Sequence, residues 1–169
     1  MLLEAFDFLR ALDFAGVFTV FWFFWLFEMP RYCLSTFAVA VQAAFGRKYP
    51  RPDPEVPVSV LLIGFNEADG LRRSVMSLRE QSHRNLEIIV VDDGSTDGMG
   101  DVAAAMMREG LIDQFFRCGT RGGKCAGLNL ALHYCKHDIF LVLDVDTSFD
   151  RDAVSKLIAP LVADPAVGA

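Results

Sequence analysis

The chain has 169 residues, of which 53% are hydrophobic, and it carries a formal net charge of -6. This length accommodates one ordinary domain with an additional segment. The negative charge, together with the lack of a basic stripe interleaved with aromatic residues, argues against nucleic acid as a partner. The apolar residues are concentrated near the N-terminus, where residues 11–45 include only three fully charged side chains, those of Asp13, Glu28 and Arg31.

The first apolar stretch, residues 14–27, reads FAGVFTVFWFFWLF and is predicted to enter a lipid bilayer. As a helix it would be about 21 Å long, so flanking residues must complete a span of the roughly 30 Å hydrocarbon core. Two arrangements remain open. In one, a single long helix is kinked at Pro30, with Glu28 and Arg31 paired at i, i+3 spacing. In the other, the chain turns at this proline, and residues 32–45 return or lie along the surface.

A cleaved signal peptide is the alternative to a membrane anchor, since Ala38 and Ala40 form an A-x-A-like site. The N-terminal flank, however, has the wrong charge for a signal peptide. Its one basic side chain, Arg10, stands beside three carboxylates, those of Glu4, Asp7 and Asp13. An uncleaved anchor is therefore favoured.

Basic residues and prolines separate the apolar segment from the rest of the chain. The positive-inside rule places Arg47, Lys48 and Arg51, and everything after them, on the cytoplasmic side of the inner (plasma) membrane. Four prolines within eight residues favour extended structure and cannot continue a helix. The expected organisation is a membrane segment at 1–49, a Pro-rich linker at 50–57 and an α/β domain at 58–169.

The residues after the linker alternate between short apolar runs and helix-like stretches. The apolar runs predict strands over 58–63, 86–91 and 139–143, and a short strand near Phe115 and Phe116. Helices are predicted from Asn66 to about Gln81, over 99–108 and over 124–134, and residues 164–169 have the pattern of the start of a further strand. Strands that alternate with helices form βαβ units, which predicts a doubly wound, mainly parallel sheet.

The strand predicted over 139–143 ends in two carboxylates one residue apart, Asp144 and Asp146. Its unbroken apolar run is typical of a strand that is covered on both faces. In an extended chain the two carboxylates project to the same side, at the strand end where open α/β sheets bind ligands. Their oxygens suit Mg²⁺ or Mn²⁺. The alternative is that the aspartates only end a buried strand in a turn.

Polar residues also follow the first two predicted strands. Asn66 is a suitable N-cap for the next helix, with Asp69 in the capping-box position, and this structural role competes with a ligand-binding one. Asp92 and Asp93 cannot both be buried without partners, which places them at an open edge. The following Gly94 allows another part of the backbone to come close.

A Gly-Gly turn opens the helix predicted over 124–134. Gly122 and Gly123 would supply unpaired backbone amides at the positive end of this helix, and Lys124 adds a mobile charge. These features suit a diphosphate group. An ordinary helix start is the alternative.

Three elements, IIVVDDGSTD, RGGKCAGLN and IFLVLDVDT, occur in this order along the chain. As a set they resemble glycosyltransferase family 2, the nucleotide-sugar transferases of the glycosyltransferase A fold, from about Pro57 to the last residue. The resemblance implies the nucleotide-sugar-binding half of that α/β fold and a UDP-sugar donor. It also implies Mg²⁺ or Mn²⁺ as cofactor and a glycan or lipid-linked acceptor.

The resemblance also implies roles for individual residues on the base side of the donor. Asn66 and Glu67 correspond to the segment that borders the nucleotide base, although Gly64 stands where the family usually has a small polar residue. One of Asp92 and Asp93, with Asp93 preferred, accepts a hydrogen bond from the uracil ring.

On the diphosphate side, the resemblance places Gly123, Lys124 and Asn129 along the donor. In the family the last aspartate of the DxD motif, here Asp146, contacts the metal. Asp144 lies nearer the ribose or a metal-bound water.

A general base for the acceptor is not recognisable in the chain, because no acidic strand end follows Asp146 and no QxxRW motif occurs. The base is expected beyond Ala169, and the chain is expected to be the donor-binding part of a longer enzyme, inactive in transfer by itself. Two functions remain: a membrane-anchored inverting glycosyltransferase of polysaccharide or glycolipid synthesis, and a non-catalytic, membrane-tethered nucleotide-binding module. A nucleotidyltransferase is disfavoured because no glycine-rich basic loop follows the first strand.

Overall fold

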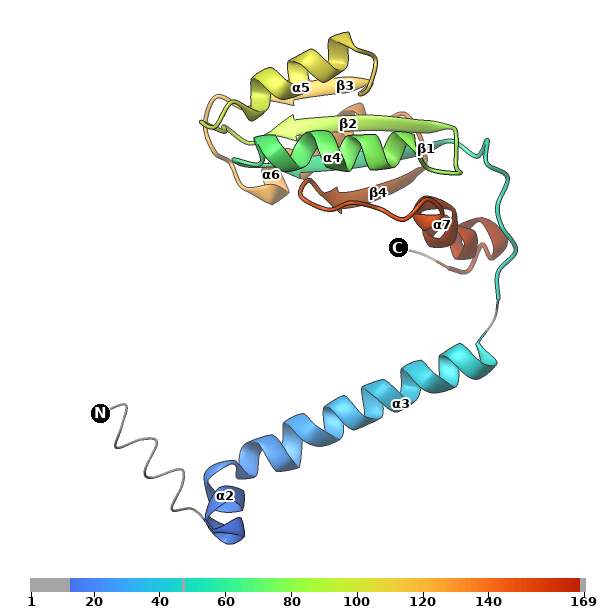
Figure 1. Ribbon diagram of the computed structural model, residues 1–169. Coiled ribbons are helices and arrows are strands. Elements are labelled where there is room, and N and C mark those ends of the chain that lie inside the picture. The colour runs from blue at the N-terminus through green and yellow to red at the C-terminus, as the bar shows by residue number, and fades with distance from the viewer. Residues whose placement is uncertain (1–12, 47, 168–169) are drawn as a thin grey trace. The chain divides into compact units, whose positions relative to one another are not determined.

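The computed structural model describes residues 13–46 and 48–167. The chain divides into two compact units, Met1–Lys48 and Tyr49–Ala169, whose elements are shown in Figure 1. The charged flank before Asp13 and the basic side chain of Arg47, on which the predicted membrane orientation depends, lie outside the described residues.

The first unit is helical. Its elements are α2 (Phe14–Val20), the π-helical segment η1 (Phe24–Glu28) and α3 (Met29–Phe45). The carboxylate of Asp13 caps α2 by accepting a hydrogen bond from the Gly16 amide at 2.7 Å. Pro30 lies in the first turn of α3, where no backbone N–H donor is required, so η1 continues into α3. The predicted pair at i, i+3 forms, with Nη2 of Arg31 2.6 Å from Oε2 of Glu28.

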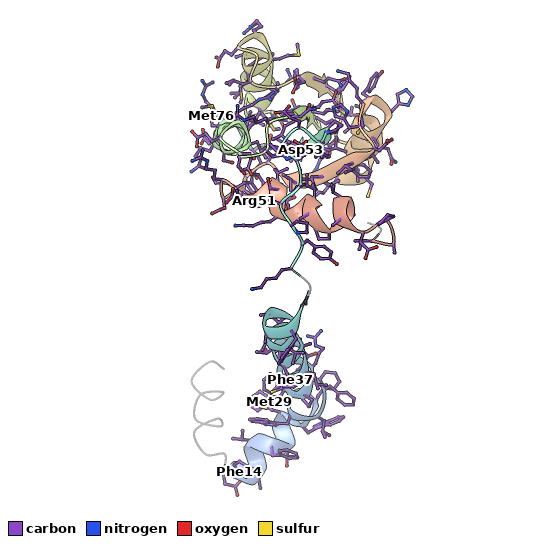
Figure 2. All side chains as sticks on the ribbon, turned by 90° about the vertical axis from the view of Figure 1, so that its right-hand side faces the viewer. Phe14, Met29, Phe37, Arg51, Asp53 and Met76 are labelled. Atoms are coloured by element: carbon purple, nitrogen blue, oxygen red, sulfur yellow. The ribbon has the colours of Figure 1, made fainter. Side chains whose placement is uncertain are left out.

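Large apolar side chains in this unit face outward. Figure 2 shows Phe14 and Phe37 projecting from the helices, and their exposed fractions are 87% and 68%. Across residues 13–46 and 48–167, no helix combines the length and the apolar character needed to cross a membrane.

The second unit is a four-stranded sheet with helices between its strands. The strands are β1 (Val58–Gly64), β2 (Leu86–Asp92), β3 (Gln114–Arg117) and β4 (Ile139–Asp144). The helices are α4 (Ala68–Arg79), α5 (Met99–Arg108), α6 (Lys124–Tyr134) and α7 (Ala153–Ala163). The strand order is β3-β2-β1-β4, and every pairing is parallel. The predicted mainly parallel α/β sheet is therefore confirmed.

Helices cover both faces of the two central strands, β1 and β2. The side chains of α4, α5 and α7 pack with one face in the larger apolar core. On the other face α6 places Ala131 against Leu61, Ile63, Ile89 and Val91. Every residue of β1 and β2 is consequently buried, as their continuous apolar runs require.

Two predictions about the end of the chain are wrong. β4 is not covered on both faces, because it lies at the sheet edge, beyond the strands that α6 covers. Its burial alternates, and Phe140 and Val142 are 40% and 38% exposed. The residues after Asp146 form α7, which the sequence pattern did not reveal, and residues 164–167 make a turn rather than a strand.

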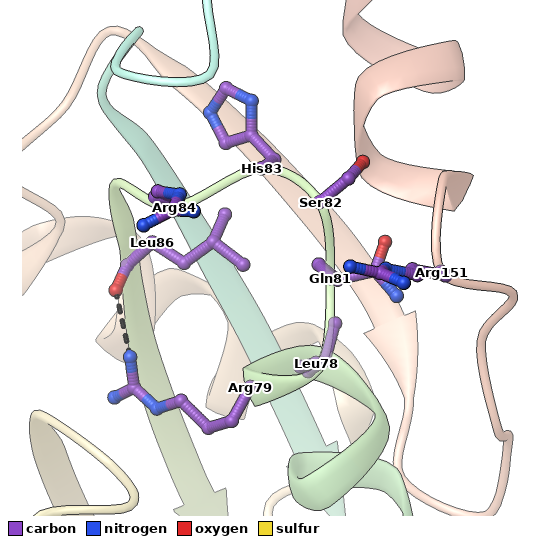
Figure 3. A pocket seen from close by; sticks show the side chains of 8 residues that line it. All are labelled: Leu78, Arg79, Gln81, Ser82, His83, Arg84, Leu86 and Arg151. Carbon is purple, nitrogen blue, oxygen red and sulfur yellow. Dashed lines mark hydrogen bonds between the residues drawn. The ribbon is translucent and has the colours of Figure 1, made fainter.

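The side chain of Gln81 lies in the loop between α4 and β2 (Figure 3) and makes three hydrogen bonds. Its Nε2 donates to the carbonyl oxygens of Ser77 and Asp150, at 3.0 and 2.8 Å. Its Oε1 accepts from the Val154 amide at 3.1 Å. The loop is therefore joined to the start of α7.

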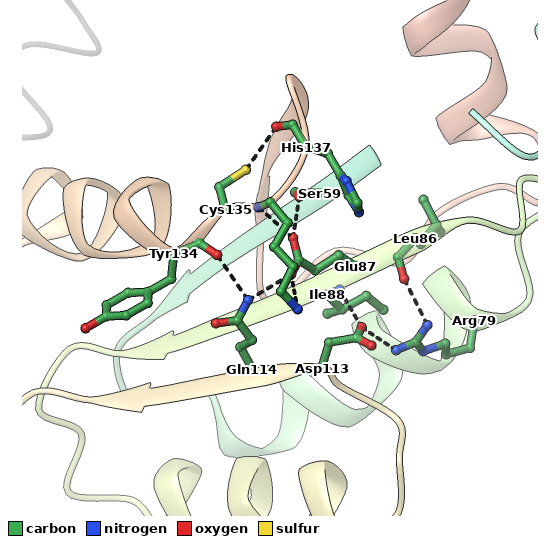
Figure 4. A network of polar contacts seen from close by, with 11 residues as sticks. Ser59, Arg79, Leu86, Glu87, Ile88, Asp113, Gln114, Tyr134, Cys135 and His137 are labelled. Atoms are coloured by element: carbon green, nitrogen blue, oxygen red, sulfur yellow. Dashed lines mark hydrogen bonds and ion pairs between the residues drawn. The ribbon is translucent and has the colours of Figure 1, made fainter. Parts of the chain in front are cut away.

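Glu87 of β2 forms a buried polar network beneath the end of α6 (Figure 4). Its carboxylate accepts from Oγ of Ser59 at 2.6 Å, from Nε2 of Gln114 at 2.8 Å and from the Lys136 amide at 3.1 Å. Burial by itself would raise the pKa of Glu87, but these hydrogen bonds outweigh it and lower the pKa to about 2. The network fixes the C-terminal end of α6 on the sheet.

Candidate active site

The carboxyl ends of all four strands meet at one edge of the sheet. The register pairs Gly64 with Asp92, Ile63 with Asp144, and Asp92 with Arg117. The loops that follow these residues lie at the same edge, since the strands are parallel. This is the edge at which open α/β sheets bind ligands.

Asp92 ends β2 and is fully buried, although an open position was predicted. Its Oδ1 accepts a hydrogen bond from the Ser95 amide at 2.8 Å. Its Oδ2 lies 3.3 Å from Nε of Arg117, which compensates the buried charge. Arg117 was missed in the sequence, but its place at the end of the short third strand could have revealed it.

Asp93 holds the Gly-Gly turn, which corrects the prediction that the amides of Gly122 and Gly123 are unpaired. Its Oδ1 and Oδ2 accept hydrogen bonds from the amides of Gly122 and Gly123, each at 2.8 Å. Asp93 is only 3% exposed, so its charge requires such partners. The two amides predicted to be free for a diphosphate are therefore already engaged.

A cavity of about 390 Å³ lies beside this turn, lined by residues 94–96 and 117–119. Burial, followed by the negative charges of Asp93 and Asp92, raises the pKa of the Cys118 thiol, so it stays neutral at physiological pH. At Gly94 a Cβ atom would lie 2.9 Å from the Arg121 amide nitrogen. The predicted close backbone approach at this glycine is confirmed.

Asn66 does not cap α4 as predicted. Its backbone has a φ of 58°, and its Oδ1 accepts from the Thr96 amide at 2.9 Å. Its own amide donates to Oγ of Ser95 at 2.9 Å. The first turn of α4 is instead capped by Asp97, which accepts from the Ala68 amide at 2.9 Å, and this bond is the main cause of the lowered pKa of Asp97.

Three carboxylates line a concavity of about 220 Å³ at the ends of β1 and β4: Glu67, Asp144 and Asp146. Asp144 and Asp146 are exposed, whereas Val145 between them is buried, so both aspartates face the open side. The backbone of Asp146 lies against α4, where a Cβ atom on Gly70 would be 3.1 Å from its Cα.

The start of α6 brings basic side chains to the same edge. Nζ of Lys124 lies 2.5 Å from Oδ1 of Asp144. The guanidinium of Arg121, which the sequence analysis did not select, lies 4.0 Å from the centre of the Phe65 ring. Asn129 is exposed on α6, five residues after Lys124, and is therefore rotated by about 140° around the helix axis from it.

The donor atoms of the concavity fit a hard divalent cation. Within the described ranges, no group of three or more His, Cys, Asp or Glu side chains is arranged to hold a metal ion. Magnesium, however, is usually held by one or two carboxylates, with water and substrate phosphates as its other ligands. Asp144 and Asp146 supply such a pair on a surface open to solvent.

A family model for Glycosyl transferase family 2 matches residues 59–169. Glycosyltransferase GlyG of Streptococcus pneumoniae is 27% identical over 100 residues, which cover 59% of this chain and 33% of that protein. Poly-beta-1,6-N-acetyl-D-glucosamine synthase of Staphylococcus aureus is 28% identical over 112 residues, which cover 66% of this chain and 27% of that protein. The chain thus spans a third or less of the length of these relatives.

Solved structures show the same fold. A mannosyltransferase, PcManGT from Pyrobaculum calidifontis in complex with GDP-Man and Mn²⁺, has a TM-score of 0.63 and 27% sequence identity, over 79% of this chain and 41% of that one. S. aureus TarS in complex with UDP has a TM-score of 0.56 and 22% identity, over 63% of this chain and 32% of that one. At that identity the likeness to TarS concerns the fold alone.

Proposed function

The chain belongs to glycosyltransferase family 2, and from this premise we propose that it provides the donor-binding part of an inverting glycosyltransferase of EC class 2.4. The donor is a nucleotide sugar, and the acceptor is a growing polysaccharide or a glycolipid. The observation that carries this proposal is the convergence of Asp93, Lys124, Asp144 and Asp146 on one edge of the sheet.

The leaving group determines what these residues must do. A nucleoside diphosphate gains negative charge as the glycosidic bond breaks. A divalent cation held by Asp144 and Asp146 would supply positive charge to this leaving group. Lys124 adds a second positive charge once its ammonium turns from Asp144 to the diphosphate.

Asp93 has two tasks in this proposal. It fixes the turn that begins α6, and so it sets the position of Lys124. Each carboxylate oxygen has two lone pairs, so Asp93 retains acceptor capacity for the N–H of a uracil ring. Phe65 and Asn66, on the loop after β1, border the base, and Glu67 lies beside the aspartate pair.

UDP is the proposed nucleotide, and GDP is the second candidate, because the similar mannosyltransferase binds GDP-Man. Isothermal titration calorimetry with UDP and GDP, with Mn²⁺ or with a chelator, distinguishes them. We expect tighter binding of UDP that depends on the metal. Asp146→Asn should weaken it at least about tenfold, which corresponds to the loss of one charge-assisted contact. Asp150→Asn is the matched control, since Asp150 is an exposed aspartate outside the concavity. Equal affinity with and without chelator would contradict the metal role.

Acceptor activation requires a general base, which we place in residues beyond Ala169. These 169 residues should then bind the donor without measurable sugar transfer, whereas a chain of the relatives' length should transfer a radiolabelled sugar. Binding without transfer in the longer chain would favour the alternative, a non-catalytic nucleotide-binding module. Transfer by the 169 residues alone would show that a carboxylate already present acts as the base.

We propose further that the N-terminal unit associates with the inner membrane and that the transferase domain is cytoplasmic. The exposed aromatic side chains of residues 14–45 support this, because their burial in lipid is favourable. Extraction of membranes with alkaline carbonate tests it. Release of the chain into the supernatant would refute membrane integration.

A further inference from the structure

A cavity of about 530 Å³ in the second unit lies away from the donor site. It is formed by the end of α4, the loop that follows, the start of β2 and one residue before α7 (Figure 3). Its lining residues are Leu78, Arg79, Gln81, Ser82, His83, Arg84, Leu86 and Arg151. This loop leads into the amino-terminal end of β2, so the cavity and the donor site lie at opposite edges of the sheet. Three arginines and one histidine line it, without a carboxylate, although the chain carries a net charge of -6.

Two of these arginines are available to a ligand. Arg79 is engaged by the carbonyl oxygens of Leu111 and Leu86 and by the carboxylate of Asp113. Arg84 and Arg151, in contrast, are exposed, and among the described residues their side chains make no hydrogen bond or ion pair. Both line the cavity, Arg84 from the loop and Arg151 from the segment before α7 (Figure 3).

The backbone that carries these two arginines is fixed. The Ser82 amide donates to the Arg151 carbonyl oxygen at 2.8 Å, which couples the loop to the segment before α7. The Arg84 amide donates to the Pro54 carbonyl oxygen at 3.0 Å. Nε2 of His83 lies 2.7 Å from the Val56 carbonyl oxygen, while its buried Nδ1 lacks a partner within the described part of the chain. The separation of the two guanidinium groups therefore depends mainly on their own side-chain rotamers.

We propose that this cavity is a binding site for a phosphate group, held by the guanidinium groups of Arg84 and Arg151. Planar guanidinium donors match the geometry of phosphate oxygens, and two unpaired arginines can neutralise the negative charge of a phosphate group. The ligand has two possible sources, a soluble phosphate compound or a lipid headgroup. A lipid headgroup is considered because the loop is hydrogen-bonded to Pro54 and Val56 of the linker. This linker closely follows the apolar N-terminal unit in the sequence.

The test uses the full chain in an uncharged detergent and inorganic phosphate as the probe, with a chelator present so that no metal contributes. Calorimetry should show binding by the wild-type chain, and the double variant Arg84→Ala, Arg151→Ala should bind at least about tenfold more weakly. Arg73→Ala is the matched control, since Arg73 is an exposed arginine of α4 outside the cavity. Unchanged thermal unfolding of the variants excludes misfolding as the cause.

A second titration identifies the source. Short-chain phosphatidylglycerol, below its micelle concentration, is compared with short-chain phosphatidylcholine. Binding of phosphatidylglycerol that requires Arg84 and Arg151 identifies a lipid headgroup, whereas arginine-dependent binding of inorganic phosphate alone identifies a soluble ligand. If neither probe binds, or if the double variant binds as tightly as the wild type, the proposal is wrong.

Discussion

The ammonium group of Lys124 lies 2.5 Å from Oδ1 of Asp144, so the first aspartate of the DVD sequence is paired with a cation of the protein itself. Both side chains are more than half exposed, at 58% and 65%. Such an exposed pair contributes at most about 1 kcal/mol. The pair is therefore easily broken, and Lys124 competes with a metal ion for Asp144.

Replacing this lysine should separate metal binding from nucleotide binding. In Lys124→Met, Mn²⁺ should bind the free chain about two- to fivefold more tightly, because the competing charge is gone. UDP should bind more weakly in the presence of Mn²⁺. Electron paramagnetic resonance of Mn²⁺ and calorimetry measure the two effects. Lys156→Met, which removes a similarly exposed pair with Asp150, should change neither.

The two hydrogen bonds that Asp93 accepts from Gly122 and Gly123 should contribute to stability as well as to binding. In Asp93→Asn one side-chain oxygen is lost, so at least one of the amides of Gly122 and Gly123 loses its acceptor. We expect the free energy of unfolding, measured by chemical denaturation, to fall by about 2–3 kcal/mol. Calorimetry should show weaker binding of uridine. Asp101→Asn, at an exposed carboxylate of α5, is the control. Wild-type stability of Asp93→Asn would show that these hydrogen bonds are dispensable for folding.

Gly70 should position Asp146. An alanine there favours the helix by up to about 1 kcal/mol, but its Cβ would lie 3.1 Å from the Asp146 Cα, so the backbone of Asp146 must shift. Gly70→Ala should therefore lower Mn²⁺ affinity several-fold without a matching loss of thermal stability. Gly119→Ala, where a Cβ would meet nothing within 4 Å, should leave metal binding unchanged. A parallel loss of stability and Mn²⁺ affinity would indicate general misfolding instead.

Glu87 should make the fold sensitive to acid. Its pKa is lowered from 4.5 to about 2, so the stability that it contributes is complete above pH 4.5 and is lost as the pH falls toward 2. The shift corresponds to about 3 kcal/mol. Glu87→Gln should flatten the dependence of unfolding free energy on pH in this window, as measured by chemical denaturation. An equally steep dependence in the variant would assign the effect to other carboxylates.

Local sequence patterns determined the elements of the second unit. The ranges predicted for the helices at 99–108 and 124–134 agree with α5 and α6, and the apolar runs agree with β1, β2 and β4. These patterns suffice because hydrophobic periodicity reflects the burial of each segment. The same patterns predicted where the strands end, and therefore the positions of Asp92 and Asp144. The resemblance to the family rests on these strand ends.

Tertiary structure alone decided the partners of the polar groups. Asp93 binds amides about thirty residues later in the chain, and the α4 cap comes from Asp97 rather than from the neighbouring Asn66. The sheet order places β4 at an edge, which leaves Phe140 and Val142 exposed despite their apolar run. A sequence pattern records how strongly a residue avoids water or favours a local turn. The packing of distant segments decides which donor or helix reaches that residue, and a local pattern contains no information about that packing.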